Sequence, residues 1–176
     1  MNIKDSNIAI VHDWFLQKSF GGAEKVSFIL NDFLKERYSA PDIFSLTSNI
    51  QSSEIKSFQG KKIQTSFIQS LPFGKTNVQS YLPFLPYAIE QLNLRKYDLI
   101  ISSSHAFAKG ILTSPDQLHI SYVHTPMRYA WDQMYTYLDK STLSKFGFEF
   151  PIRLMLYKLR EWDFYSSQRL DYVIAN

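Results

Sequence analysis

The sequence contains no cysteine. Disulfide bonds, zinc sites built from thiolates and a thiol nucleophile are therefore excluded, and the absence fits a cytoplasmic location. The chain also lacks any apolar run near the ~18–20 residues that a membrane-spanning helix needs. We expect no signal peptide, because the residues before the first predicted strand show no such pattern. The net charge is only +3 and Lys and Arg are not clustered, so nucleic acid is not an expected partner.

The composition is typical of a soluble folded domain, with 45% hydrophobic and 20% charged residues. The length of 176 residues predicts a single domain over 1–176, because domains commonly contain roughly 100–200 residues. Aromatic residues are abundant, at 16%. Tyr and Trp suit surfaces that are both wet and apolar, such as sugar sites and membrane interfaces. A general preference of the source organism for Phe and Tyr explains the same number.

The N-terminal part of the chain has the pattern of a strand–helix–strand unit. Residues 7–12 form a short apolar run typical of a buried strand. A helix begins at Gly21 and Gly22, ends before Pro41, and is followed by a second strand at 43–46. One face of this helix is apolar and is expected to meet the core; it carries Ala23, Val26, Leu30 and Phe33, with Ile29 and Leu34 beside them. Such a unit favours a parallel sheet with a right-handed crossover.

The rest of the chain continues to alternate between strand and helix patterns. Strands are predicted at 97–102, 118–123 and 171–175, with a weaker one at 62–68. Helices are predicted from about Pro83, over 126–138 and over 151–169. The alternation predicts a Rossmann-like, doubly wound α/β domain with a mainly parallel sheet. Because the sequence stops after its last strand without a closing helix, we expect this domain to be part of a longer protein.

The paired glycines Gly21 and Gly22 are the first candidate site. They stand at the start of a helix, after the loop that follows the first strand. Ligands of open α/β sheets bind beyond the carboxyl ends of the strands, and the backbone N–H groups of a helix N-terminus favour phosphate. The segment is not G-x-G-x-x-G and has no P-loop lysine, which disfavours a nicotinamide or ATP site. The alternative is that the glycines only form the turn.

The second candidate site follows the strand at 118–123 and contains His124 and Arg128. An imidazole at a strand end can bond a sugar hydroxyl or stabilise charge near a reacting carbon. The Arg128 guanidinium can bind phosphate or carboxylate through two parallel hydrogen bonds. Ordinary structural roles, a core histidine and a surface charge, are the alternatives.

A third candidate site is the run Ser102-Ser103-Ser104-His105 at the end of another strand. Its hydroxyls and His105 are candidates to line the same cleft, while capping of a helix by Ser104 is the alternative. A hydrolase triad is disfavoured because the chain has no G-x-S-x-G motif. His12, His105 and His124 all stand at strand ends, but their spacing matches no zinc pattern, so no metal site is predicted.

The helix predicted at 151–169 is amphipathic. It carries Arg153, Lys158 and Arg160 among Leu, Met, Tyr and Trp residues. A face turned to the core accounts for this pattern, and a helix lying on a membrane surface is the alternative.

These motifs together resemble glycosyltransferase family 4, in particular bacterial polysaccharide and O-antigen sugar transferases of the mannosyltransferase type. The matching pieces keep the order of the family and cover nearly the whole chain. They are residues 8–14 (IAIVHDW), 21–26 (GGAEKV), 102–105 (SSSH), 122–132 (YVHTPMRYAWD) and 171–176 (DYVIAN). The glycine pair alone is weak evidence, but its combination with the HTPMRY segment and the final AN is more specific.

The resemblance implies a GT-B architecture, in which two Rossmann-like domains enclose a cleft. This chain corresponds to the N-terminal, acceptor-side domain, and the donor-binding C-terminal domain lies outside it. We therefore expect the chain to be inactive by itself. The resemblance implies that Gly21 and Gly22 approach the donor diphosphate and that His124 is the catalytic residue near the transferred sugar. It places acceptor contacts at Asp13, Trp14, His105 and Arg128.

The family retains the anomeric configuration and generally needs neither a bound metal nor another cofactor. The implied partners are a nucleotide sugar, with GDP-mannose as one candidate, and an oligosaccharide or undecaprenyl-diphosphate-linked acceptor. Such enzymes work at the inner face of the plasma membrane, which implies peripheral membrane contact. Two other functions stay open on the sequence: a GT-B-fold sugar-nucleotide epimerase, and a non-catalytic, flavodoxin-like ligand-binding domain.

Overall fold

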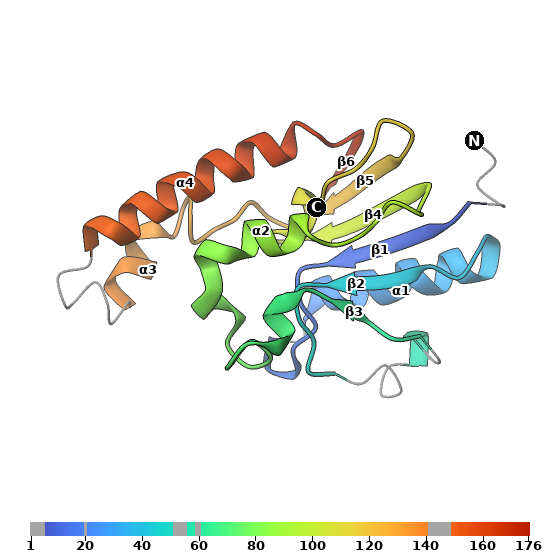
Figure 1. The fold of residues 1–176 in the computed structure, drawn as a ribbon, viewed down its shortest axis with the longest axis horizontal. Coiled ribbons are helices and arrows are strands. Elements are labelled where there is room, and N and C mark those ends of the chain that lie inside the picture. Colours follow the sequence, from blue (N-terminus) through green and yellow to red (C-terminus); the bar gives the residue numbers. More distant parts are fainter. Residues whose placement is uncertain (1–5, 20, 51–55, 59–60, 141–148) are drawn as a thin grey trace.

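A computed structural model of the chain describes residues 6–19, 21–50, 56–58, 61–140 and 149–176. Its sheet is parallel throughout, with the strand order β3-β2-β1-β4-β5-β6 (Figure 1). This is the order of doubly wound Rossmann domains, and it confirms the predicted fold class. The strands are β1 (Ile8–His12), β2 (Asp42–Ser45), β3 (Gln64–Thr65), β4 (Leu99–Ser104), β5 (Leu118–Val123) and β6 (Tyr172–Ala175).

Helices connect the strands and cover the sheet (Figure 1). The α-helices are α1 (Gly22–Arg37), α2 (Leu85–Glu90), α3 (Met134–Lys140) and α4 (Glu149–Ser167). The 3-10 helices are η2 (Gln17–Ser19), η4 (Lys56–Phe58), η5 (Phe67–Ser70), η6 (Val78–Phe84) and η7 (Ala108–Gly110). Among the described helices, none is both long enough and apolar enough to cross a bilayer.

The core divides into two layers because successive strand residues point to opposite faces of the sheet. On one face, Ala9 and Val11 of β1 share a cluster with buried side chains of α2 and α4. On the other face, Ile8 and Ile10 pack with Leu34 of α1 and with η4. The predicted helix at 151–169 is therefore present as α4, and it buries one side in the core.

Two predicted elements are shorter than expected. The strand predicted at 62–68 is limited to Gln64–Thr65, because the chain turns into η5 directly afterwards. Ser66 starts this turn: its hydroxyl donates to the Leu46 carbonyl at 2.7 Å and accepts the N–H of Ile68. The helix predicted from Pro83 is also reduced, because η6 runs through this proline and α2 begins only at Leu85.

The helix predicted over 126–138 is wrong in its first half. Residues 126–133 contain turns, and α3 begins only at Met134. Tertiary contacts hold this stretch in its irregular path. The Trp131 indole N–H donates to Asp163 of α4 at 2.8 Å, and the Arg160 guanidinium donates to the carbonyl of Ala130 at 2.9 Å.

The prediction for the apolar face of α1 is confirmed only in part, because Leu34 is buried and Leu30 packs against the core but other members are exposed. Ile29 and Phe33 are 67% and 43% exposed. The residues that α1 buries are Glu24, Ser27, Asn31 and Leu34. The three polar members are tolerated because they have partners: Glu24 accepts the N–H of Gly21, Ser27 donates to the Ala23 carbonyl, and Asn31 donates to the Ser57 carbonyl. A rule that assigns only apolar residues to the core fails here, because polar groups can be buried when they are hydrogen-bonded.

A buried ion pair joins the segment after β4 to α4. Lys109 of η7 and Asp163 of α4 are 3% and 5% exposed, and the ammonium group contacts a carboxylate oxygen. The second carboxylate oxygen accepts the indole N–H of Trp131. Glu90 of α2 accepts the indole N–H of Trp162 at 2.9 Å. These contacts fix the C-terminal half of α4 against the end of β4.

Gly110 marks a close approach between η7 and α4. A Cβ atom at this position would lie 2.2 and 2.4 Å from two carbons of the Trp162 ring. We therefore expect Gly110→Ala to lower the free energy of unfolding by about 1–3 kcal/mol, the usual cost of overpacking, as measured by urea denaturation. Gly22→Ala is the matched control, because a Cβ there meets nothing within 4 Å. Equal stabilities of the two variants would contradict this packing.

Candidate functional site

The carboxyl ends of β1 and β4 adjoin in the centre of the sheet. Because the chain reverses its strand order between them, this is the position where doubly wound domains bind ligands. His12, the last residue of β1, lies opposite Ser103 of β4. A cleft of about 400 Å³ opens beside these strand ends. Five of the predicted site residues line it: Trp14, Gly21, Gly22, His105 and Arg128.

The glycine segment forms the N-terminus of α1, as predicted. The first hydrogen bond of the helix runs from the Lys25 N–H to the Gly21 carbonyl at 3.4 Å. The amides of Gly22 and Ala23 precede this bond, so the helix itself offers them no acceptor. Both residues line the cleft. The Gly21 N–H is already engaged, because it donates to the Glu24 carboxylate at 2.8 Å.

Glu24 and His12 form a buried polar pair beneath the cleft. The Nδ1 atom of His12 lies 2.8 Å from the Ser103 carbonyl and must donate to it, because a carbonyl oxygen only accepts. The other ring nitrogen lies 3.9 Å from the Glu24 carboxylate, too far for a direct hydrogen bond. Burial alone would raise the pKa of Glu24, but His12 and the backbone amides hold it below its ordinary value. His12 Nε2 has no hydrogen-bond partner in the described structure, so the bond from the Gly21 N–H is what holds the Glu24 carboxylate at the start of α1.

Asp13 is wholly buried and surrounded by donors. Its carboxylate accepts four consecutive backbone N–H groups, at 2.7 Å from His105, 3.2 Å from Ala106, 2.8 Å from Ala108, and also from Phe107. Burial would raise the pKa of Asp13, yet neighbouring histidines and these amides lower it. With 0% exposure, its carboxylate supports the loop after β4 and has no surface to offer an acceptor.

The serine run predicted at this strand end forms the last three residues of β4, Ser102, Ser103 and Ser104. Capping of the segment by Ser104 was one alternative, but the amides of this loop bond to Asp13 instead. The Ser104 hydroxyl is buried and has no hydrogen-bond partner in the described structure. Ser102 and Ser103 are buried as well, and none of the three serines lines the cleft.

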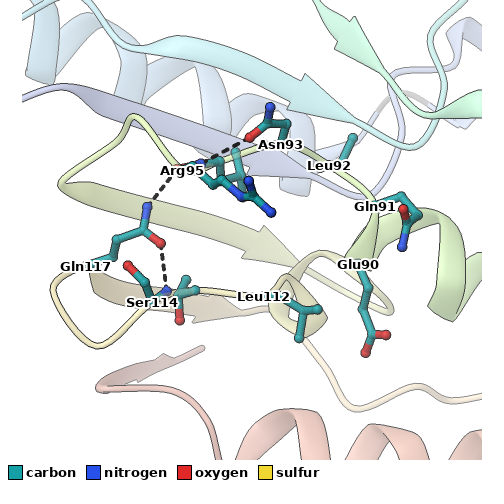
Figure 2. A pocket seen from close by; sticks show the side chains of 10 residues that line it. Glu90, Gln91, Leu92, Asn93, Arg95, Leu112, Ser114 and Gln117 are labelled. Carbon is teal, nitrogen blue, oxygen red and sulfur yellow. Dashed lines mark hydrogen bonds between the residues drawn. The ribbon is translucent and has the colours of Figure 1, made fainter.

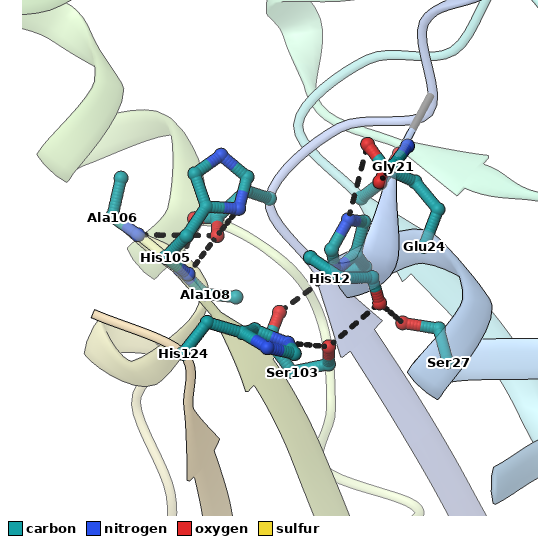
Figure 3. Close-up of polar contacts among 12 residues, drawn as sticks. His12, Gly21, Glu24, Ser27, Ser103, His105, Ala106, Ala108 and His124 are labelled. Atoms are coloured by element: carbon teal, nitrogen blue, oxygen red, sulfur yellow. Dashed lines mark hydrogen bonds and ion pairs between the residues drawn. The ribbon is translucent and has the colours of Figure 1, made fainter. Parts of the chain in front are cut away.

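His105 extends from this loop into the cleft. Its Nδ1 atom lies 3.0 Å from the Asp13 carboxylate, although the N–H direction is too oblique for a well-aligned hydrogen bond. The Trp14 ring meets the imidazole edge to face, with 4.8 Å between ring centres. Figure 3 shows the opposite side of the His105 ring pointing away from the loop amides of Ala106 and Ala108.

His124 follows β5 and reaches back toward β4 (Figure 3). Its Nε2 atom lies 2.9 Å from the Ser103 hydroxyl, which also contacts the Ala23 carbonyl at 3.3 Å. Burial lowers the pKa of His124 below its ordinary value of 6.5, and the neighbouring His12 and His105 lower it further. The ring is therefore neutral near pH 7. It sits beside the cleft wall, where the next residue, Thr125, is a lining residue.

Arg128 is the exposed cation of the cleft. Its guanidinium lies 3.5 Å from the Asp132 carboxylate, and both side chains are more than half exposed. Such exposed pairs contribute little to stability. The guanidinium is thus available to an anionic ligand.

Five lining residues were not predicted as site residues: Ala23, Glu24, Gln79, Thr125 and Tyr129. Gln79 belongs to η6, where no sequence pattern marked it. Tyr129 lies within the motif that contains His124, yet its hydroxyl was not singled out. That hydroxyl is buried without a hydrogen-bond partner in the described structure, and burial raises the pKa of Tyr129 well above 10.0.

Another hollow, of about 560 Å³, lies between the segments that lead into β4 and β5 (Figure 2). Its polar side chains mostly brace the backbone. The Gln117 amide group donates to the carbonyls of Leu94 and Tyr97, both at 2.6 Å, and accepts the Ser114 N–H. This hollow is at the amino ends of the strands, so the topology favours the other cleft as the ligand site.

No group of three or more His, Asp or Glu side chains in the described ranges is arranged to hold a metal ion. The fold and the cleft define a Rossmann-like α/β domain with a cleft at its topological switch point. No family model, curated protein or solved structure matches the chain. The resemblance to glycosyltransferase family 4 therefore rests on the sequence motifs.

Proposed function

We propose that this chain is the acceptor-side domain of a retaining glycosyltransferase, which transfers a sugar from a nucleotide sugar such as GDP-mannose. The acceptor is an oligosaccharide or an undecaprenyl-diphosphate-linked saccharide at the inner membrane face. The observation that carries the proposal is the cleft at the switch point, where Gly22, His105 and Arg128 converge. It combines donors for a diphosphate with side chains that suit sugar hydroxyls.

Backbone N–H groups form the part of the cleft that we assign to the diphosphate. The N–H groups at the start of α1 and the helix dipole favour an anion, and Arg128 adds a positive charge on the same cleft. Gly22 supports this role, since a Cβ atom there would meet no protein atom within 4 Å. The fold does not require glycine at this position, whereas a ligand that approaches the backbone closely does.

The sugar side is formed by imidazole and indole groups. His105 lines the cleft with Trp14 packed against it. His124, neutral and held through Ser103, is suited to orient the sugar and to stabilise the charge that develops as the diphosphate leaves. Fixed groups of this kind cost no reorganisation during the reaction.

Gly22→Ala tests the diphosphate assignment on the chain itself. We expect pyrophosphate and GDP-mannose, at millimolar concentration, to shift the amide NMR signals of Gly22 and Ala23. We expect the variant to bind about tenfold more weakly, a loss of about 1.4 kcal/mol, because the methyl group occupies the ligand's place. Urea denaturation is the control and should show unchanged stability. Equal binding by the two proteins, or no shift in the wild type, would refute the assignment.

A further inference from the structure

The outer face of α4 carries a row of exposed apolar side chains. The inner face of this helix is buried in the core through residues such as Leu156 and Leu159, and the helix lies along one margin of the molecule (Figure 1). A row of large apolar side chains in water on one helix face marks an interaction surface. Its members, each between 46% and 76% exposed, are Phe150, Leu154, Tyr157, Phe164 and Tyr165.

Charged side chains beside and between these residues occur in equal numbers of each sign. Arg153 pairs with Glu149 at 2.7 Å, and Lys158 pairs with Glu161 at 2.8 Å. All four side chains are at least 38% exposed, so these pairs contribute little to stability and can exchange partners. An anionic bilayer attracts an excess of Lys and Arg, which this face does not have. The balance of charge favours a partner that also carries both signs.

The pattern on this face is symmetric about Tyr157, with opposite charges at equivalent positions. Phe150 and Phe164 each stand seven residues from Tyr157. Arg153 stands four residues before Tyr157, and Glu161 stands four residues after it. Because four and seven residues are about one and two helical turns, these positions share one face. When two such helices pack antiparallel with Tyr157 at the twofold axis, Arg153 of each copy lies level with Glu161 of the other.

We propose that the chain forms a homodimer through the outer faces of two antiparallel α4 helices. A twofold interface must be complementary to itself, because the same patch serves both copies. Here the contact between Arg153 and Glu161 occurs twice, and the phenylalanines seven residues on either side of Tyr157 meet in two further pairs. Burial of these aromatic rings supplies the apolar part of the interface. The dimer is independent of the proposed transferase activity.

Analytical ultracentrifugation tests the charge contacts. We expect the wild-type chain to dimerise at micromolar concentration. Arg153→Glu and Glu161→Arg should each weaken dimerisation by roughly 10–100-fold, because like charges would then face each other twice. An equimolar mixture of the two variants should dimerise as tightly as the wild type, because every charge again faces its opposite. Lys35→Glu, the same change of charge at an exposed position of α1, is the matched control and should leave the dimer unchanged.

The same measurements can refute the proposal. All the substituted side chains are exposed, so circular dichroism should show that the variants remain folded. A wild type that stays monomeric up to its solubility limit would overturn the proposal, and so would two variants that fail to restore dimerisation when mixed. A monomeric wild type that binds phosphatidylglycerol vesicles, and loses this binding in Tyr157→Glu, would show that a bilayer covers the face instead.

The absence of cysteine permits a direct test of the twofold axis. Packed helices have axes about 8–10 Å apart, so Tyr157→Cys would place the thiols of two copies close enough for a disulfide bond. We expect this variant to form disulfide-linked dimers under mild oxidation much faster than Phe33→Cys, which is the matched control at an exposed position of α1. Equal rates of cross-linking in the two variants would overturn the proposed arrangement.

Discussion

Replacement of Asp13 by alanine is expected to lower the free energy of unfolding by about 3–5 kcal/mol, the usual cost of breaking a buried charged network. The change would leave the backbone N–H groups of His105, Ala106, Phe107 and Ala108 buried without an acceptor. Each unsatisfied buried donor carries its own desolvation penalty. The loop after β4 would have to rearrange to reach water.

Urea denaturation followed by circular dichroism measures this effect. Asp116→Ala, at an exposed acid elsewhere in the chain, is the matched control and should change stability by less than about 0.5 kcal/mol. Asp13→Asn keeps the size of the side chain but places an NH₂ group among donors, so it should also be strongly destabilised. If Asp13→Ala lost less than about 1 kcal/mol, the anchoring role of the carboxylate would be wrong.

Acidification from about pH 7 to pH 4 is expected to destabilise the fold by about 3 kcal/mol through His119 alone. Burial lowers the pKa of His119 from 6.5 to about 4 in the folded chain. The ring is 1% exposed, and its Nε2 atom lies 2.8 Å from the Ser102 hydroxyl. Between the two pKa values the unfolded chain binds a proton that the folded chain does not, so stability falls as the pH drops. At 1.36 kcal/mol for each pKa unit, the difference between 6.5 and about 4 corresponds to about 3 kcal/mol.

The free energy of unfolding, measured at several pH values between about 7 and 3, tests this prediction. His119→Gln keeps a polar side chain near Ser102 but cannot titrate, so its curve should lose most of the slope seen in the wild type. The slope that remains is expected from His124, whose pKa burial also lowers. Protonation of Asp13 should cause a separate loss of stability at lower pH. Because its folded pKa is below its ordinary value of 3.8, its contribution is complete above that value and is lost as the pH falls through the lower one. An unchanged slope in His119→Gln between about pH 6.5 and 4.5 would show that another group titrates.

Much of the fold was predictable because its signals are local. Apolar runs of strand length marked β1, β2, β4, β5 and β6, and the long amphipathic pattern marked α4. Part of the cleft lining was predictable as well, although Asp13 and His124, also predicted for the site, do not line the cleft. Side chains that follow parallel strands gather at one edge of a sheet, which is why Gly22, His105 and Arg128 were expected together and do line one cleft.

The missed features depend on partners that are remote in the sequence. Asp13 and the four amides that bind it are more than ninety residues apart along the chain, so no local pattern shows that this acid faces inward. Asn31 of α1 is buried for the same reason, since its side-chain amide donates to the carbonyl of Ser57, 26 residues further along the chain. The irregular stretch before α3 is held by Asp163 and Arg160 of a later helix.

The sequence by itself determined the α/β class and the order of elements along the chain. It also showed which strand ends carry the candidate site residues. These features follow from hydrophobic periodicity and from the positions of glycine and proline. Only the tertiary structure decided that β4 pairs with β1, that the cleft therefore lies between Gly22 and His105, and that Asp13 faces the loop rather than a ligand. Strand pairing and the hydrogen bonds that stabilise a buried charge depend on contacts between segments that are far apart in the sequence. No single stretch of residues therefore predicts them.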